Sequence, residues 1–315
     1  YELSFLLVLC VSLFAGSFAF QRSTLGLFVL WAVFIPFAII AGFQPRFTTV
    51  PNALTFQVVT IFLFFTSFWV ANYVAQEPQK RMRLIVAAYV VGATISAAMG
   101  TLGYLGLIPG HDLLTLYGRA KALFNDPNVF APFLILPAMY ALQRVLLAKP
   151  SRAVVGAIVV MIIAVGVFAS FSRAAWAHLI ASGLIVYLLC FFGVANAREK
   201  VRMLITAIVG VTVVIVLLGG LLSIPKVQEL FDTRAQAQSY DEGDSGRFGR
   251  QGYAFELALA NPLGIGPYEF RNLHIKEEPH DSYVDVLHVY GWGGGLMFYL
   301  FVIVTIWRGV RFVFR

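Results

Sequence analysis

Arginine and histidine side chains gather in one long polar interval of a chain that is otherwise apolar. The interval runs from Ser239 to Gly291 and carries Arg247, Arg271 and His280 between two apolar runs. Arginine supplies a permanent charge and forked donors that suit phosphate oxygens, and an imidazole can accept a proton at neutral pH. We therefore expect the chemistry of this protein to take place in this interval.

Two arginines of this polar interval stand where a helix should begin. Arg247 and Arg250 follow a turn-rich segment and precede the helically periodic run Tyr253–Leu259, which Asn261-Pro262 should end. Arginines at such an entrance can join the N-terminal amides of the helix in holding a phosphate. The alternative is an ion pair with the acidic residues just upstream, Asp241, Glu242 and Asp244. We assign phosphate binding to Arg247 and leave the role of Arg250 undecided.

His280 stands at the mouth of the last apolar segment, directly before a helix N-cap at Asp281. Helical spacing places Asp281, Asp285 and His288 on one face, where they can orient a base or bind a sugar. We expect His280 to act as a general base. The alternative is a histidine that only caps the helix or lies on the surface. The roles of His274 and His288 are left undecided.

The run NPLGIG at residues 261–266 superficially resembles a phosphate loop. No strand precedes it, so a nucleotide site is not expected, and Gly264 and Gly266 are expected to let the backbone turn tightly near a ligand. Asp112 and Asp126 do not form the Asp-x-Asp pair of metal-dependent glycosyltransferases, and no paired-cysteine pattern is present. We therefore expect neither a metal site nor a cofactor.

Arg173 is the most informative residue outside the polar interval. It lies between two apolar runs, in the sequence SFSRAAW. A charge at this depth is costly and usually faces a cavity or a partner. The alternative is an arginine that extends to the headgroup level and touches lipid phosphate, which suits the cytoplasmic side better than the outer side. We expect Arg173 to have a functional role.

The composition identifies the scaffold that must position these residues. Of the 315 residues, 59% are hydrophobic and only 12% are charged, whereas soluble domains carry roughly 25% charged residues. The chain is therefore expected to be an all-α polytopic membrane protein. A net charge of +7 is typical of the basic cytoplasmic loops of such proteins, so membrane lipids, and no nucleic acid, are expected as partners. Cys10 and Cys190 lie in apolar runs and are assigned neither to a disulfide nor to a metal.

A helix needs about 20 apolar residues to cross the bilayer core. The apolar runs predict about nine spans: Leu3–Phe20, Leu25–Phe43, Ala53–Ala75, Leu84–Ile108, Val129–Leu147, Ala153–Phe171, Ala174–Phe192, Met203–Leu222 and Tyr283–Trp307. His288 and the glycines after Tyr290 interrupt the last run, which predicts a broken or re-entrant helix. The chain then divides into membrane helices at 1–222, a catalytic loop with short helices at 223–280, and the broken final segment at 281–315.

Basic residues predict the orientation of the chain. They fall in alternate short loops, all of which can be cytoplasmic at once, as the positive-inside rule requires. The long loop at 223–280, the corner at Arg173 and the loops at 44–52 and 109–128 then face the outside. Leucines in Pro109–Asn128 predict an amphipathic turn along the interface, and Asp126-Pro127 should begin the next span. The same count places Tyr1 outside, which predicts further spans upstream in a larger bundle.

With these residues in view, the chain resembles the O-antigen ligase / O-antigen polymerase superfamily of bacterial inner membranes. The resemblance extends from about residue 115 onward. It rests on short motifs in the family's order: Gly118-Arg119, FNDPN ending at Asn128, Ser172-Arg173, Ser245-Gly246-Arg247, NPLGIG at 261–266, and His280-x-Ser282-Tyr283 with Gly291 following. The sequence departs from the family pattern where Asp281 replaces an asparagine and Pro267-Tyr268-Glu269-Phe270 replaces Pro-Gly-Asn-Phe.

The resemblance implies an inverting glycosyl transfer at the periplasmic face of the inner membrane, with O-antigen ligation in lipopolysaccharide biosynthesis favoured. The donor would be a glycan linked to undecaprenyl diphosphate, and the acceptor a sugar hydroxyl of lipid A–core. The implied roles are diphosphate binding by Arg173, Arg247 and Arg271, a weaker phosphate or structural contact by Arg119, general base catalysis by His280, and support from Asp281 and Tyr283. The alternatives are a polymerase that joins lipid-linked repeats, and a transporter of anions or lipid-linked sugars.

Overall fold

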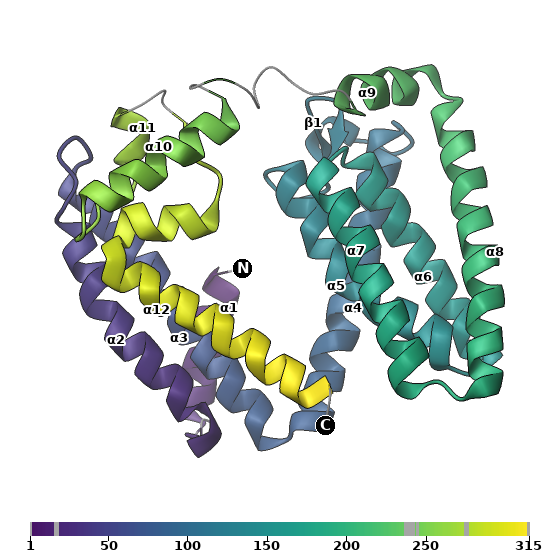
Figure 1. Ribbon diagram of the computed structural model, residues 1–315, viewed down its shortest axis with the longest axis horizontal. Coiled ribbons are helices and arrows are strands. Elements are labelled where there is room, and N and C mark those ends of the chain that lie inside the picture. Colours follow the sequence, from purple (N-terminus) through teal and green to yellow (C-terminus); the bar gives the residue numbers. More distant parts are fainter. Residues whose placement is uncertain (1, 16–18, 236–242, 244–245, 274–276, 314–315) are drawn as a thin grey trace. The chain divides into compact units, whose positions relative to one another are not determined.

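The computed structural model describes residues 2–15, 19–235, 243, 246–273 and 277–313. Its contacts divide the chain into two compact units, and each is described by itself (Figure 1). The terminal unit contains residues 1–81 and 238–315, and the central unit contains residues 82–237. This division follows contacts rather than chain order, and the linear division into 1–222, 223–280 and 281–315 stays a prediction.

The described chain is almost entirely helical, which confirms the predicted all-α class. Short helices also occupy the predicted loop at 223–280. The helices are α1 (Glu2–Phe14), α2 (Leu25–Gly42), α3 (Val50–Gln76), α4 (Pro78–Tyr104), α5 (Pro127–Leu147), α6 (Pro150–Ala169), α7 (Arg173–Leu189), α8 (Ala197–Leu222), α9 (Pro225–Ala235), α10 (Arg247–Ala260), α11 (Phe270–Leu273) and α12 (Ser282–Val313). Short 3-10 turns stand at Arg22–Thr24 and His111–Leu114, and a π-helical turn at Cys190–Val194 follows α7.

Eight described helices are long and apolar enough to cross a membrane, namely α2 to α8 and α12. They coincide with eight of the nine predicted spans and confirm a polytopic membrane protein. The remaining predicted span, Leu3–Phe20, corresponds to α1, which has 13 residues. At 1.5 Å per residue this helix is about 20 Å long, short of the roughly 30 Å hydrocarbon core. Residues 16–18 of that predicted span lie outside the described residues.

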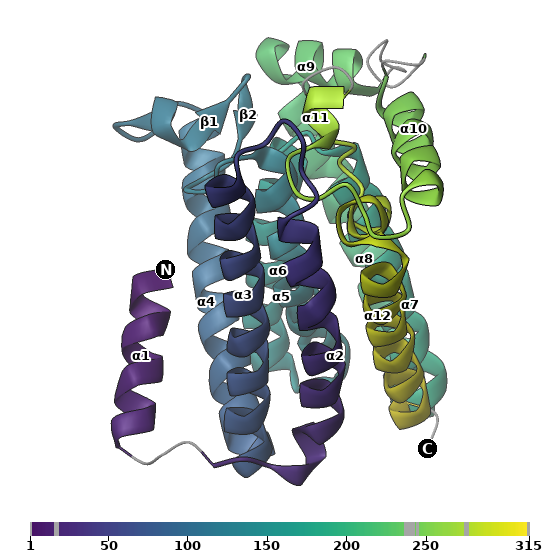
Figure 2. The same cartoon turned by 90° about the vertical axis from the view of Figure 1, so that its left-hand side faces the viewer.

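The core of the terminal unit is formed by α2, α3 and α12. Helices α2 and α3 lie side by side (Figure 2). The ring of Trp31 on α2 stacks on Phe64 of α3, with ring centroids 4.0 Å apart. On α12, Tyr290 packs edge-on against Phe34, and its hydroxyl lies 3.0 Å from Oγ1 of Thr60. This aromatic cluster fixes the first half of α12, and therefore its entrance, against the two other helices.

The last helix is broken at Gly291, where φ is 69° and ψ is −173°. The loop 261–267 packs into the break through backbone hydrogen bonds. Ile265 N donates to His288 O at 2.7 Å, and Trp292 N donates to Pro262 O at 2.9 Å. This confirms the predicted broken final segment. Gly264, with φ of 81°, turns tightly as predicted, and the backbone of Gly291 lies directly against it.

Replacing Gly291 with alanine is expected to destabilise the protein severely, because the added Cβ meets the carbonyl oxygen of Pro262 and the carbonyl carbon of Leu263 in a left-handed backbone conformation. Gly309 on the same helix provides a matched control, since a Cβ there meets nothing within 4 Å. Gly309→Ala is expected to be neutral or slightly stabilising. Thermal unfolding in detergent measures both variants. Equal melting temperatures for the two would contradict this role of Gly291.

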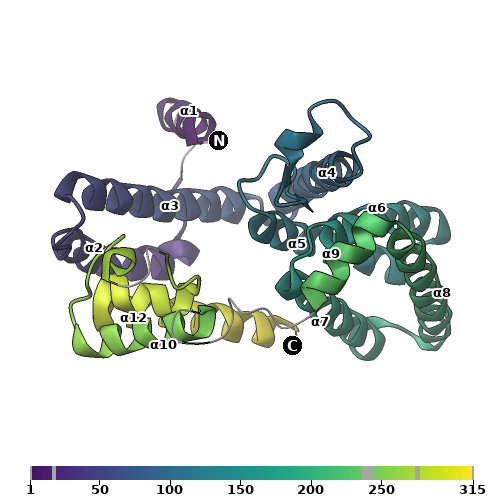
Figure 3. The same ribbon diagram turned by 90° about the horizontal axis from the view of Figure 1, so that it is seen from above.

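The core of the central unit lies among α4, α5, α6 and α7. Phe130 and Leu134 of α5, with Ile163 and Val167 of α6, are completely buried in it. Helix α9 lies across the ends of these helices (Figure 3), and Phe231 from α9 stacks on Trp176 of α7 with centroids 5.7 Å apart. This packing covers the corner at which α6 turns into α7.

The predicted amphipathic turn at Pro109–Asn128 is a 3-10 turn followed by a short antiparallel hairpin. Strands β1 (Thr115–Leu116) and β2 (Arg119–Ala120) pair with Thr115 opposite Ala120 and Leu116 opposite Arg119. The predicted start of α5 is confirmed, because Asp126 accepts a hydrogen bond from Asn128 N at 2.6 Å and Pro127 stands at the first helical position. The hairpin carries Arg119 into the core of the central unit.

Candidate functional site

The predicted site residues divide between the two units. Arg119 and Arg173 belong to the central unit, and we call them with their surroundings the central half-site. The others belong to the terminal unit and form the terminal half-site: Arg247, Arg271, His280, Asp281 and Tyr283. Each half-site is described within its own unit.

In the central half-site, Arg173 is the first residue of α7. The chain reaches it through a sharp corner in which Phe171 has φ of 49°. Ser170 and Ser172 are buried in this corner, and Ser172 N donates to Ser170 Oγ at 3.2 Å. The first turn of a helix presents backbone N–H groups and a positive dipole end to an anion. The half-buried Arg173 therefore adds a full charge to an end of a helix that already favours anions.

Arg119 is buried, with 7% of its surface exposed. Its Nε donates to Ser170 O at 2.7 Å, and its Nη2 donates to Asn128 Oδ1 at 2.8 Å. These contacts join the hairpin, the start of α5 and the corner that precedes Arg173. Of the two roles implied for Arg119, they favour the structural one, because the guanidinium holds the corner in place from inside the unit.

In the terminal half-site, the segment 277–280 runs beside α10. Arg250, which is buried, forms an ion pair with Glu277, and Gln251 Nε2 lies 3.5 Å from Pro279 O. The acidic residues expected to pair with Arg250, at 241, 242 and 244, lie outside the described residues. Arg250 therefore has a structural partner that stands close to the site. Arg247 lies one helical turn before Gln251 on the same helix face, so it shares a face with the contact that precedes His280.

Arg271 approaches the same segment from α11. Its guanidinium lies over the ring of Tyr268, with Cζ 4.7 Å from the ring centroid. Burial raises the pKa of Glu278, and the charge of Arg271 acts in the opposite direction. Arg271 thus belongs to α11, and Gln251, one turn after Arg247 on α10, contacts Pro279 directly before His280.

His280 is exposed and has φ of 55°, a left-handed conformation. Asp281 Oδ1 accepts hydrogen bonds from Tyr283 N at 2.9 Å and Val284 N at 3.2 Å, which confirms the predicted N-cap of α12. The carbonyl of Tyr283 accepts from the hydroxyl of Tyr299 at 2.8 Å. Asp281 and Tyr283 thus fix the helix entrance directly after His280.

His288 is a residue of the core. It is 1% exposed, its Nδ1 lies 3.1 Å from Val284 O, and its ring packs against Phe270 at 5.4 Å between centroids. Its other polar neighbour is Asp285, whose Oδ1 is 3.8 Å from Nδ1. Asp285 and His288 therefore share a face as predicted, but His288 is enclosed in the protein. His274 lies outside the described residues.

Glu269 is a site residue that sequence reasoning missed. Its side chain is buried, and its carboxylate accepts hydrogen bonds from Arg46 N at 2.7 Å, Phe47 N at 2.9 Å and Thr48 N at 3.1 Å. The sequence showed this residue only as a departure from a family motif. A carboxylate placed between Tyr268 and Phe270 was the single available signal, and its partners lie more than 200 positions away along the chain.

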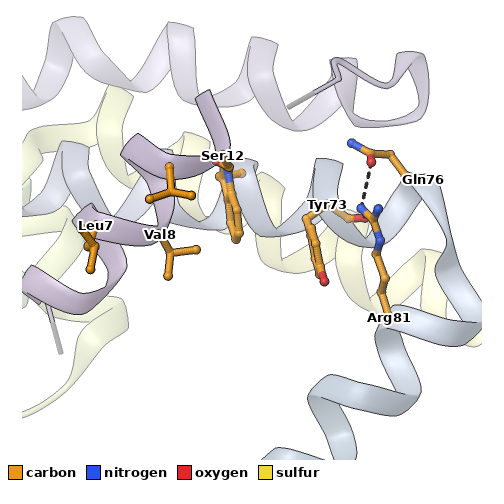
Figure 4. Close-up of a pocket in the computed structure, with 8 residues that line it drawn as sticks. Leu7, Val8, Ser12, Tyr73, Gln76 and Arg81 are labelled. Atoms are coloured by element: carbon orange, nitrogen blue, oxygen red, sulfur yellow. Dashed lines mark hydrogen bonds between the residues drawn. The ribbon is translucent and has the colours of Figure 1, made fainter. Parts of the chain in front are cut away.

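A cavity of about 370 Å³ lies elsewhere in the terminal unit, between α1 and the last turns of α3 (Figure 4). Apolar side chains such as Leu7 and Val8 line most of it, and the guanidinium of Arg81 stands at one end. Arg81 donates to Tyr73 O at 2.6 Å and to Gln76 Oε1 at 2.9 Å, so it caps the end of α3. None of the predicted site residues lines this cavity.

No group of three His, Cys, Asp or Glu side chains is placed to hold a metal among the residues that the structure describes. Each half-site contains arginine, whose charge is available to an anion. Arginine offers this charge with fixed, forked donors, so the chemistry that the half-sites suit is the binding of phosphate oxygens.

Residues 157–299 match a family model described as O-antigen ligase. The matched range begins within α6 and ends within α12, so it contains Arg173, Arg247, Arg271 and His280 and leaves Arg119 outside. No curated protein and no solved structure matches the chain.

Proposed function

The chain carries a domain of the O-antigen ligase family at residues 157–299, and from this premise we propose that it is a metal-independent, inverting glycosyltransferase. It moves a glycan from undecaprenyl diphosphate onto a sugar hydroxyl of lipid A–core, at the periplasmic face of the bacterial inner membrane. A glycosyl transfer of the ligase or polymerase type in a membrane follows from the family. The donor, the acceptor and the orientation are our proposal.

The observation that supports this proposal best is the arrangement around segment 277–280. Arg271 acts on Glu278, α10 contacts Pro279, and His280 is exposed directly after them. The segment directly before His280, at the entrance of a membrane helix, therefore contacts the helix that begins with Arg247. Phosphate-binding groups next to a proton acceptor are what transfer from a diphosphate donor requires.

The proposed reaction is a single displacement. The acceptor hydroxyl attacks the anomeric carbon of the donor sugar, and the bond from that carbon to the diphosphate oxygen breaks. The hydroxyl proton passes to His280, and undecaprenyl diphosphate leaves with the electron pair. Attack opposite the leaving group inverts the anomeric configuration. Proton removal by a positioned base typically contributes 10²–10⁴-fold in rate.

The arginines act on the charge that develops as the bond breaks. Arg247 and Arg271 are proposed to bind the diphosphate, and the same role is proposed for Arg173. Hydrogen-bond donors that are already in position need not reorganise as this charge develops. Removing one typically raises the activation barrier by about 3 kcal/mol. Arg119 supports Arg173 through the corner at Ser170. Asp281 and Tyr283 hold the helix entrance beside His280.

Transfer with purified components tests the proposal. The protein in detergent receives a lipid-linked glycan donor and lipid A–core as the only acceptor, and the glycosylated product is measured. Extension of the lipid-linked glycan instead would identify the polymerase alternative. Movement of the donor across a vesicle membrane with no new glycosidic bond would identify the transporter alternative.

Chelation tests the absence of a metal requirement. Incubation with EDTA followed by desalting is expected to leave the transfer rate unchanged, because arginines supply the charge that a divalent cation would otherwise supply. The initial rate with and without added Mg²⁺ or Mn²⁺ measures this. Loss of activity that either ion restores would contradict the proposal.

A further inference from the structure

Glu269 joins two loops of the terminal unit, and each of these loops carries an exposed arginine. Its carboxylate accepts from three successive backbone N–H groups of the turn between α2 and α3, beginning with Arg46. Asn272 Nδ2 adds a contact to Thr48 Oγ1 at 3.3 Å. Any Cβ at Gly266 would meet Pro45, so the two loops are also in close contact there. Arg46 and Arg271 are therefore carried by backbone segments that are fixed to each other.

The side chains of both arginines remain available on the surface of this junction. Arg46 and Arg271 are both exposed. The guanidinium of Arg271 lies over the ring of Tyr268, and Tyr268 packs edge-on against Phe56 of α3 with centroids 5.1 Å apart. Stacking restrains a guanidinium while its in-plane N–H groups stay open to a ligand. The junction thus holds a preorganised donor group beside a second charge.

The acidic groups of the junction do not cancel these charges. Glu269 is buried, and its oxygens are occupied by the three N–H donors. Burial raises the pKa of Glu278, and the charge of Arg271 lowers it by a smaller amount. The surface that the junction presents is therefore cationic.

We propose that Arg46 and Arg271 form a phosphate-binding pair and that Glu269 is the positioning residue that sets their separation. The ligand is a phosphate group at the membrane surface, supplied either by the diphosphate of a lipid-linked donor or by an anionic phospholipid headgroup. The proposed pair depends on the proposed function only if the phosphate belongs to the lipid-linked donor. It adds Arg46, from the turn between α2 and α3, which lies outside the range matched by the family model.

Two binding measurements on the full chain test the pair. In the first, farnesyl diphosphate is titrated into protein in a phospholipid-free detergent. In the second, protein in phosphatidylcholine vesicles is challenged with phosphatidylglycerol, and bound lipid is counted by native mass spectrometry. Arg46→Gln and Arg271→Gln are each expected to weaken binding about tenfold in the measurement, farnesyl diphosphate or phosphatidylglycerol, that supplies the phosphate source the pair recognises. The exposed Arg83, changed to Gln, is the matched one-charge control and is expected to have no effect.

The outcomes separate this pair from the proposed function. Weaker binding in only one of the two measurements supports the pair and identifies the source of the phosphate. Unchanged binding by Arg46→Gln in both measurements overturns the pair. Wild-type protein that binds farnesyl diphosphate but transfers no glycan would remove the proposed function and leave the pair. Transfer that is normal in Arg46→Gln, with binding also normal, would remove the pair and leave the function.

Glu269→Gln separates positioning from direct contact. The amide keeps one acceptor oxygen but presents an N–H group to a backbone donor, so the turn at Arg46 loses a hydrogen bond while both arginines remain. Weaker binding in this variant, with an intact thermal unfolding transition, supports the positioning role. Arg46→Lys, which keeps the charge but loses the fork, is expected to bind with intermediate affinity. Full affinity in Glu269→Gln would contradict the role of Glu269.

Discussion

Transfer is expected to fall at least about 100-fold when Arg247 is replaced by alanine, and by a similar factor for Arg173→Ala. Each variant removes a fixed hydrogen-bond donor that stabilises the negative charge developing on the diphosphate leaving group. Loss of one such donor typically lowers kcat 10²–10³-fold. Both arginines stand at the first residue of a helix, so the backbone N–H groups remain and some activity should survive. Initial rates with purified protein at saturating donor measure the effect.

The controls for this prediction use the same helix and the same charge. Phe248, the exposed neighbour of Arg247, provides Phe248→Ala, which is expected to retain activity. Arg247→Lys keeps the charge and loses the forked donors, so its rate should lie between those of wild type and alanine variant. Guanidine added to Arg247→Ala should restore part of the rate. An alanine variant at near-normal activity would refute a role for Arg247 on the diphosphate.

His280→Ala is expected to lower the transfer rate at least about 100-fold, because the acceptor hydroxyl loses the group that takes its proton. Wild-type activity should fall toward acidic pH as the base becomes protonated, and this fall should disappear in the variant. Added imidazole, or alkaline buffer, should restore part of the variant's rate. The pH–rate profile and the dependence of the rate on imidazole concentration together measure these effects.

A second histidine provides the comparison. His111 is also exposed and belongs to a loop outside the terminal half-site. His111→Ala should keep the wild-type pH profile and show no response to imidazole. If His280→Ala loses activity but neither imidazole nor alkaline pH raises its rate, His280 contributes to the structure of the helix entrance rather than to proton transfer.

The helix ends and breaks could be predicted because local residues determine them. Asp126 and Asp281 cap α5 and α12 as expected, since a carboxylate at that position accepts the N–H groups of the turn that follows. The break in α12 was predicted from its glycine run, because glycine permits the left-handed conformation found at Gly291. For the predicted span Leu3–Phe20 the structure describes a helix of 13 residues, and with residues 16–18 outside the described residues the full span stays a prediction.

The partners of the charged residues could not be predicted in the same way. Arg250 pairs with Glu277, 27 positions further along the chain, because the course of the chain after α10 brings segment 277–280 back along that helix. Arg119 was expected to make a phosphate or structural contact, and its burial and its hydrogen bond to Ser170 O, which favour the structural role, could not be read from the motif. Sequence spacing describes the face of one helix, and it carries no information about which helix packs beside it.

The sequence by itself determined that this is a helical membrane protein and where most of its helices begin, whereas the assignment of residues to the chemistry stays a prediction. These properties depend on hydrophobicity, capping and backbone freedom, which act over a few neighbouring residues. Only the tertiary structure decided that Glu269 holds the turn at Arg46 and that His288 is a core residue. Those roles arise from contacts between distant segments, and packing, rather than local pattern, selects such contacts.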